Sequence, residues 1–255
     1  LTPDSFYDGG KYNKNKEAAL KHIEQLINDG ADIIDIGGES TRPYSEPITV
    51  SEELNRIIDI VSEYKKNFAK IPLSIDTTKI EVARIALDNG ADIINDISGN
   101  SVNNGIAQLC AEYKAGLVIM HIKGTPSTMQ NPENLKYNHL SNEMLEFFEN
   151  LLNNCIDTGL SNESITIDPG IGFAKTPEHC VEILRRLNEF TIFKRPILIG
   201  LSNKSFLGHL TGAQISDRLS ATIAANAYAF NNSASIFRIH NIKENKLALE
   251  TIKHL

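Results

Sequence analysis

Residues 29–35 read DGADIID and residues 89–95 read NGADIIN, so one short pattern occurs twice in the chain. In each copy a glycine stands where a helix would end, and a strand is expected to follow it. The strand positions do not alternate between apolar and polar, which is typical of a strand covered on both faces in a parallel sheet. The repeat therefore predicts a βα unit that is used more than once.

The rest of the chain continues this alternation of short apolar runs and longer helical patterns. Strands are expected at residues 33–36, 72–76, 92–96, 116–121, 164–168, 196–201 and 234–239. Helices are expected at residues 16–29, 51–66, 79–89, 104–114, 141–158, 177–188, 216–230 and 242–254.

This count of elements predicts an α/β fold, the (β/α)8 TIM barrel, with its first strand placed before Leu1. A doubly wound open sheet is the alternative. The length of 255 residues and the lack of a GxGxxG motif after the early strands favour the barrel. No linker-like segment or shift in composition divides the chain, so we expect a single domain over residues 1–255.

The charge and hydropathy of the chain exclude some classes of partner. The formal net charge of −7 argues against nucleic acid. Neither a long apolar run nor a signal peptide indicates a membrane protein. The three cysteines, Cys110, Cys155 and Cys180, fit no metal or redox spacing, and their odd number argues against a disulfide framework. We therefore expect buried thiols in a reduced, cytoplasmic protein.

Polar side chains stand at the ends of nearly all the expected strands. Each has an ordinary structural explanation, such as a helix cap, a turn or a hydrogen-bonded core histidine. In a barrel, however, the carboxyl ends of the strands meet at one rim, where the active site lies. The residues concerned are Asp35, Glu39–Arg42, Asp76, Asn95, Asp96, His121, Lys123, Asp168, Ser202–Ser205, Arg238 and His240.

Two kinds of chemistry are present in this set. The acceptors and donors of Asp76, Asn95, Asp168 and Lys204 suit a flat, nitrogen-rich ring, because a carboxylate accepts two parallel N–H bonds from such an edge. A second subset, Arg42, Arg238 and His240, suits an anion.

Two other barrel chemistries fit the sequence poorly. A metal hydrolase would need several histidines, usually as HxH on a strand, and that motif is absent. A retaining glycosidase could use Asp76 and Asp168 as its carboxylate pair. It would leave the cationic residues without a role, and the chain has no tryptophan to stack on a sugar.

The motifs around these residues resemble those of the dihydropteroate synthase family over the whole chain. They are TPDSFYDGG (2–10), GADIIDIGGESTRP (30–43), SIDTTK (74–79), NDISG (95–99), MHIKGTPSTM (120–129), DPGIGFAKTPEH (168–179), GLSNKSFLG (200–208) and RIH (238–240). The resemblance implies a pterin-binding TIM barrel that joins 6-hydroxymethyl-7,8-dihydropterin diphosphate to 4-aminobenzoate. The products are 7,8-dihydropteroate and diphosphate, in folate biosynthesis, and sulfonamides compete with 4-aminobenzoate.

The resemblance also implies a role for each motif residue. The pterin ring would contact Asp35, Asp76, Asn95, Met120, Asp168, Gly172, Phe173 and Lys204. The diphosphate would contact Asp4, Arg238 and His240, and the aminobenzoate site would include Phe6, Thr41, Arg42, Pro43 and Ser205. Asp76, Lys204, Arg238 and His240 would act in catalysis.

The family mechanism agrees with the chemistry of these groups. An arylamine attacks without a strong general base, so carbon–oxygen cleavage is the difficult step. We expect an S_N1-like path in which cations stabilise the leaving diphosphate and Asp76 stabilises the pterin cation. Mg²⁺ accompanies the diphosphate in the family, but the family's asparagine ligand would precede Leu1. A homodimer and fusion to a pterin pyrophosphokinase are further family expectations.

Two positions depart from the family pattern. Asn203 replaces the arginine of SRKS, and Asn241 replaces the aspartate of RxHD. Two rival functions share the pterin pocket. A methyltetrahydrofolate-dependent methyltransferase has no diphosphate to bind, so Arg238, His240 and the TPDSF loop argue against it. A non-catalytic pterin-binding homologue would not need Arg42, Lys204 and Arg238.

Overall fold

The structure is a computed structural model, and it describes residues 16–255. The described chain forms two compact units. Residues 16–119 and 151–165 make up the first unit, and residues 120–150 and 166–255 make up the second. The single domain predicted from the sequence stays a prediction. The strand expected before Leu1 lies outside the described residues.

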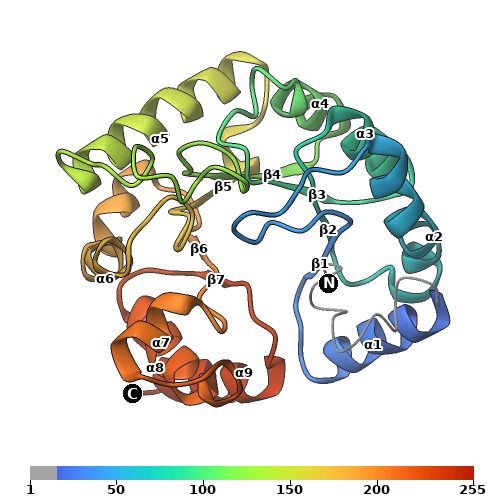
Figure 1. Cartoon of the computed structure of the whole chain (residues 1–255). Coiled ribbons are helices and arrows are strands. Elements are labelled where there is room, and N and C mark those ends of the chain that lie inside the picture. The colour runs from blue at the N-terminus through green and yellow to red at the C-terminus, as the bar shows by residue number, and fades with distance from the viewer. Residues whose placement is uncertain (1–15) are drawn as a thin grey trace. The chain divides into compact units, whose positions relative to one another are not determined.

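The first unit alternates helices and strands. Its elements are α1 (Lys16–Asn28), β1 (Ile34–Gly37), α2 (Val50–Phe68), β2 (Leu73–Asp76), α3 (Ile80–Asp88), β3 (Ile93–Asp96), α4 (Ile106–Tyr113) and β4 (Gly116–Met120), whose last residue belongs to the second unit. Strands β1 to β4 pair in parallel in chain order, with Ile36 opposite Ile75 and Ile75 opposite Ile94. Helices α2, α3 and α4 follow one another along these strands (Figure 1).

Both copies of the opening repeat form the predicted helix end and strand. Gly30 and Gly90 have φ angles of +103° and +91°, a conformation that glycine adopts without strain. The residue after each glycine donates its N–H to the carbonyl five residues earlier, as in a Schellman motif, which ends α1 and α3. The chain then enters β1 and β3.

The strands of this unit place apolar and polar side chains on opposite faces. Ile36, Ile75 and Ile94 are fully buried. Because side chains alternate along a strand, Asp35, Asp76 and Asn95 lie on the other face. Each buried Ile contributes about 1.5–3 kcal/mol relative to an exposed one. The same packing that stabilises the sheet therefore directs the polar side chains to a common face.

The second unit contains the remaining strands and helices. Two elements are shared with the first unit: α5 (Leu140–Asp157) belongs to the second unit up to Asn150, and β5 (Ile165–Asp168) belongs to it from Thr166 on. The others are α6 (Pro177–Arg185), β6 (Leu198–Ile199), α7 (Ser205–Thr211), α8 (Leu219–Asn231), β7 (Ile236–Phe237) and α9 (Ile242–Lys253). Ile167 bridges to Ile197 in parallel, and β6 pairs in parallel with β7. Helix α8 packs against both α7 and α9.

All seven expected strands and all eight expected helices are present, with shorter bounds for several. Strands β6 and β7 have two residues each. The helix expected at 177–188 ends at Arg185, because the chain tightens into a 3-10 turn over Leu187–Phe193. The helix expected from residue 216 begins at Leu219, after a 3-10 turn over Ile215–Asp217.

The three cysteines are buried, as predicted. Burial raises the pKa of the Cys110 and Cys155 thiols to about 12. Both therefore stay protonated near neutral pH. Within residues 16–255 we find no helix with the length and apolar character to cross a membrane.

Candidate active site

Three predicted pterin residues, Asp35, Asp76 and Asn95, lie together on neighbouring strands of the first unit. Asp76 and Asn95 are partners in the β2–β3 register and are each 4% exposed. The Asn95 side-chain amide lies 3.5 Å from Asp35 Oδ2 and donates to it. The structure therefore gathers two carboxylates and an amide on one face, and two of these three, Asp76 and Asn95, belong to the set expected for a nitrogen-rich ring.

The loop after β1 carries the residues predicted for aminobenzoate. Arg42 and Pro43 are exposed, and Thr41 is half-buried. The Ser45 hydroxyl donates to the Ser40 carbonyl at 2.8 Å, which closes the loop around these residues. This places an arginine on an accessible loop at the end of a strand.

An ionic cluster that the sequence did not reveal anchors this loop. Lys79 Nζ lies 2.6 Å from Glu53 Oε2 and 2.9 Å from Glu39 Oε2. Glu39 Oε1 also accepts the Ile48 N–H at 2.8 Å. Burial acts to lower the pKa of Lys79, but its hydrogen bonds to Glu53 and Glu39 outweigh this and raise the pKa. The lysine therefore stays charged and ties both ends of the loop to α2.

The close approach of the loop to α2 requires a glycine at position 38. A Cβ there would lie 2.8 Å from both Cγ and the carbonyl oxygen of Glu53. Glu53 is fully buried although it belongs to a helix with many exposed charges. Gly38 thus lets the chain pass close over the buried glutamate.

The second unit brings together Asp168, Gly172, Phe173 and Lys204. The Gly170 N–H donates to Asp168 Oδ1 at 2.7 Å, and Lys204 Nζ lies 4.4 Å from the centroid of the Phe173 ring. Gly172 has a φ angle of +82°, a conformation that favours glycine, and it lies beside the Lys204 side chain.

The pKa of Asp168 reflects its surroundings. Desolvation raises this pKa, whereas the Gly170 N–H and nearby positive charges act to lower it. The charges belong to Lys204, Lys175 and Arg238. The carboxylate of Asp168 is therefore held among donors and cations in a partly dry setting.

Two predicted anion ligands follow β7. The Arg238 N–H donates to the Ile199 carbonyl at 2.9 Å, which aligns this segment with β6. His240 Nδ1 lies 2.8 Å from the Ser202 hydroxyl, and the His240 N–H donates to the same oxygen at 3.3 Å. Ser205 is exposed at the first position of α7. Arg238 and His240 thus follow one short strand, with the imidazole ring oriented by Ser202.

Two further buried side chains of this unit, His121 and Lys175, have no predicted substrate contact. Met120, a predicted pterin residue, ends β4 and is buried. The next residue, His121, is 3% exposed and its Nδ1 lies 2.9 Å from Nζ of the buried Lys175. The alternative reading of His121 as a hydrogen-bonded core histidine is therefore correct. The sequence does not predict the contact of Lys175 with His121, because the two residues lie 54 positions apart.

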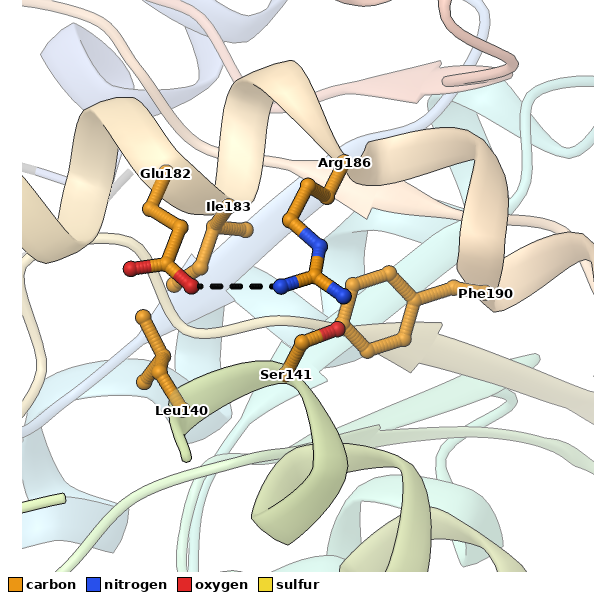
Figure 2. Close-up of a pocket in the computed structure, with 6 residues that line it drawn as sticks. All are labelled: Leu140, Ser141, Glu182, Ile183, Arg186 and Phe190. Atoms are coloured by element: carbon orange, nitrogen blue, oxygen red, sulfur yellow. Dashed lines mark ion pairs between the residues drawn. The ribbon is translucent and has the colours of Figure 1, made fainter. Parts of the chain in front are cut away.

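A separate pocket lies between the first turn of α5 and α6, and Figure 2 shows its lining residues. Arg186 pairs with Glu182 at 3.5 Å and with Glu189 at 2.7 Å, so its charge is already neutralised. An adjoining hollow of about 310 Å³ extends to His139 and His179. No predicted site residue within 16–255 lines either space.

Two predicted site residues, Asp4 and Phe6, lie outside the described residues. The resemblance also predicts a magnesium ion, which would need oxygen ligands from the protein or the substrate. Between residues 16 and 255 no group of three or more His, Cys, Asp or Glu side chains could hold a metal. The magnesium ion stays a prediction, because Mg²⁺ on a diphosphate usually takes only one or two protein carboxylates.

The family pattern described as "Pterin binding enzyme" matches residues 1–240. The chain belongs to this family. The dihydropteroate synthase of Synechocystis sp. is 42% identical over 243 residues, which is 95% of this chain and 83% of the relative. The chain is thus also a member of the dihydropteroate synthase group, as its motifs indicated.

Two solved structures support the same assignment. A Yersinia pestis dihydropteroate synthase with a sulfonamide drug complex matches with a TM-score of 0.92 and 33% identity, covering 100% of this chain and 90% of that one. A Xanthomonas albilineans dihydropteroate synthase in complex with 7,8-dihydropteroate matches with a TM-score of 0.86 and 32% identity, covering 100% and 90%. The likeness to these enzymes gives this chain the α/β fold of the TIM-barrel class, as predicted.

Proposed function

We propose that this chain is a dihydropteroate synthase. It condenses 6-hydroxymethyl-7,8-dihydropterin diphosphate with 4-aminobenzoate and releases 7,8-dihydropteroate and diphosphate. The observation that carries the proposal is that the chain belongs to this family over residues 1–240 and that its described motif residues lie on or directly after the strands. Among the proposed ring-binding residues, Asp76 and Asp168 end β2 and β5. Asp35 and Asn95 lie within β1 and β3, and the proposed anion-binding residues follow β7.

The pterin ring is the ligand that best suits these polar groups. In the first unit, the buried Asp76 and Asn95 can accept from and donate to its amino, ring-nitrogen and carbonyl groups. In the second unit, the half-buried Asp168 is a further proposed acceptor. Phe173 offers a ring face and Lys204 lies over that face, so a flat ligand would meet an aromatic surface and a cation. Asp35, Met120 and Gly172 complete the proposed contacts.

The leaving diphosphate would be stabilised by Arg238 and His240, with Asp4 also proposed to contact it. In the reaction, the bond between the pterin methylene carbon and the bridging oxygen breaks, and diphosphate leaves with the electron pair. Positive charge then spreads over the pterin ring, where the buried carboxylate of Asp76 stabilises it. The cations lower the barrier by stabilising the charge that develops on the leaving group.

The amine nitrogen of 4-aminobenzoate then attacks the methylene carbon and loses a proton to water. We assign the aminobenzoate site to Phe6, Thr41, Arg42, Pro43 and Ser205. Arg42 is exposed on a loop whose base is held by Glu39 and Lys79, so it can meet the carboxylate of the substrate. Sulfonamides would compete for the same residues.

Three further features belong to this proposal. Mg²⁺ would accompany the diphosphate, with its protein ligands drawn in part from residues outside 16–255. The active protein would be a homodimer, and in its natural form the chain could be fused to a pterin pyrophosphokinase. None of these features is needed for the pterin contacts described above.

Release of diphosphate that depends on 4-aminobenzoate tests the function. A methyltetrahydrofolate-dependent methyltransferase would instead transfer a methyl group, and a non-catalytic homologue would bind pterin without turnover. We expect release with both substrates and none when 4-aminobenzoate is omitted. Absence of release from the full natural chain, with pterin binding retained, would contradict the proposal and favour the non-catalytic alternative.

A further inference from the structure

Lys175 is a buried lysine beside the proposed pterin residues that the proposed chemistry does not use. It is 4% exposed, and its Nζ lies 2.9 Å from His121 Nδ1, 3.2 Å from the His121 carbonyl and 2.9 Å from the Phe173 carbonyl. In its protonated form the side chain has three N–H donors. These three acceptors use all of them, which indicates that Lys175 holds protein groups and does not bind substrate.

His121 is built to accept from this lysine. Burial lowers the pKa of His121 to about 2, and the charges of Lys175 and Lys123 act in the same direction, so the ring stays neutral. Its Nδ1 can accept a hydrogen bond only if the ring proton is on Nε2. The ring packs edge-on against Phe147, at 4.8 Å between centroids, which fixes its orientation.

The backbone of His121 connects the lysine to Asp168. The His121 N–H donates to the Asp168 carbonyl at 3.0 Å. A Cβ on Gly170 would overlap the His121 carbonyl oxygen, so the two backbones are in close contact. The Gly170 N–H in turn donates to Asp168 Oδ1. The carbonyl that Lys175 binds therefore supports the turn that holds the Asp168 carboxylate.

The third contact of the lysine supports the other side of the proposed pterin site. The Phe173 carbonyl accepts from Lys175 Nζ, and the ring of the same residue lies under Lys204. The Tyr137 hydroxyl donates to the next carbonyl, that of Ala174, at 2.9 Å. Ala174 has a φ angle of +52°, which a residue other than glycine adopts only when its surroundings hold it.

We propose that Lys175, held by His121, is a positioning residue that sets the separation between the Asp168 carboxylate and the Phe173 ring. The inference rests on the proposed function, because it takes a pterin ring to be the ligand that binds between the Asp168 carboxylate and the Phe173 ring. Without the lysine, the two carbonyls and Nδ1 would lack their shared donor, and the turn from Asp168 to Phe173 would relax. A relaxation of this kind weakens binding strongly, because oriented contacts are lost together.

The test compares Lys175→Met with His121→Leu, His121→Asn and Lys253→Met. Methionine keeps most of the volume of lysine without its charge, and asparagine can still present an acceptor where leucine cannot. Lys253, in α9, has a side chain that is 63% exposed and serves as the matched surface control. The assays are calorimetric titration with 6-hydroxymethylpterin and steady-state kinetics with each substrate varied in turn.

We expect Lys175→Met and His121→Leu to weaken pterin binding at least tenfold. His121→Asn should stay within about threefold of the wild type, and Lys253→Met should match it. The KM for 4-aminobenzoate at saturating pterin diphosphate should change less than twofold in all four variants. A purely structural role would lower the melting temperature and leave the pterin Kd of the folded protein unchanged.

A Lys175→Met protein that folds and binds pterin within twofold of the wild type would overturn the inference. If that variant does not fold, the His121 pair decides, and equal pterin affinity of His121→Leu and the wild type would overturn it. Failure of the wild-type protein to bind 6-hydroxymethylpterin would instead contradict the proposed function. The two failures are therefore distinguishable.

Discussion

The buried amine of Lys175 predicts a pH-dependent stability that a Lys175→Met variant lacks. Burial lowers the pKa of Lys175 from 10.5 to about 7 in the folded protein. The unfolded chain therefore binds more protons than the folded chain between these two values. Stability consequently rises with pH over this interval, and the cost of burying the amine is greatest below about pH 7.

The size of the effect follows from the two pKa values. Each unit of pKa difference corresponds to about 1.4 kcal/mol, and the interval from pH 7.0 to pH 9.5 covers most of the shift. After allowance for the half-protonated amine at pH 7.0, the wild type should gain about 3 kcal/mol relative to Lys175→Met between these pH values. Methionine cannot titrate, and the other ionisable groups are common to both proteins.

Urea unfolding of both proteins at pH 7.0 and pH 9.5 measures this difference. The quantity to compare is the free energy of unfolding of the wild type minus that of the variant, and the account predicts that it increases by about 3 kcal/mol. For the control, the free energy of unfolding of the wild type minus that of Lys253→Met should be the same at both pH values. A difference between wild type and Lys175→Met that is the same at both pH values would refute the claim that burial controls this amine.

Three other substitutions test separate parts of the account. Lys79→Met leaves the buried Glu53 without its ion partner and should lower the free energy of unfolding by about 3–5 kcal/mol. Adding Glu53→Gln to this variant should recover part of the loss, and a double variant no more stable than Lys79→Met would contradict the ionic cluster. Gly38→Ala should cost about 1–3 kcal/mol in urea unfolding, because its Cβ would meet Glu53, and an unchanged midpoint would show that the loop has room. Asp76→Asn should reduce kcat at least about 100-fold with little change in the KM for 4-aminobenzoate, and near wild-type turnover would rule out the electrostatic role of this carboxylate.

The features that local sequence patterns determine were predicted well. A glycine at a helix end followed by β-branched residues is a local signal, and it located β1 and β3 to within one residue. The polar residues that follow each buried run located Asp76 and Asp168 as the last residues of β2 and β5, and Asn95 one residue before the end of β3. These signals depend on backbone conformation and burial, which act over a few residues.

The features that depend on distant partners were not predicted. Lys175 and His121 are far apart in sequence, and nothing near either one indicates that they meet inside the second unit. Glu53 lies on a helix with several exposed charges, so its burial follows only from the approach of Gly38 and Lys79. The sequence pattern does not predict the 3-10 turn after α6, because apolar residues continue through it.

The central claim is that the chain joins a pterin to an arylamine, and mass-spectrometric detection of the product tests it most directly. The natural full-length protein, incubated with 6-hydroxymethyl-7,8-dihydropterin diphosphate and 4-aminobenzoate, should form 7,8-dihydropteroate together with one equivalent of diphosphate. A sulfonamide should reduce this product in competition with 4-aminobenzoate, and Arg238→Ala should form it far more slowly. Folded wild-type protein that binds the pterin substrate but forms no dihydropteroate would contradict the account.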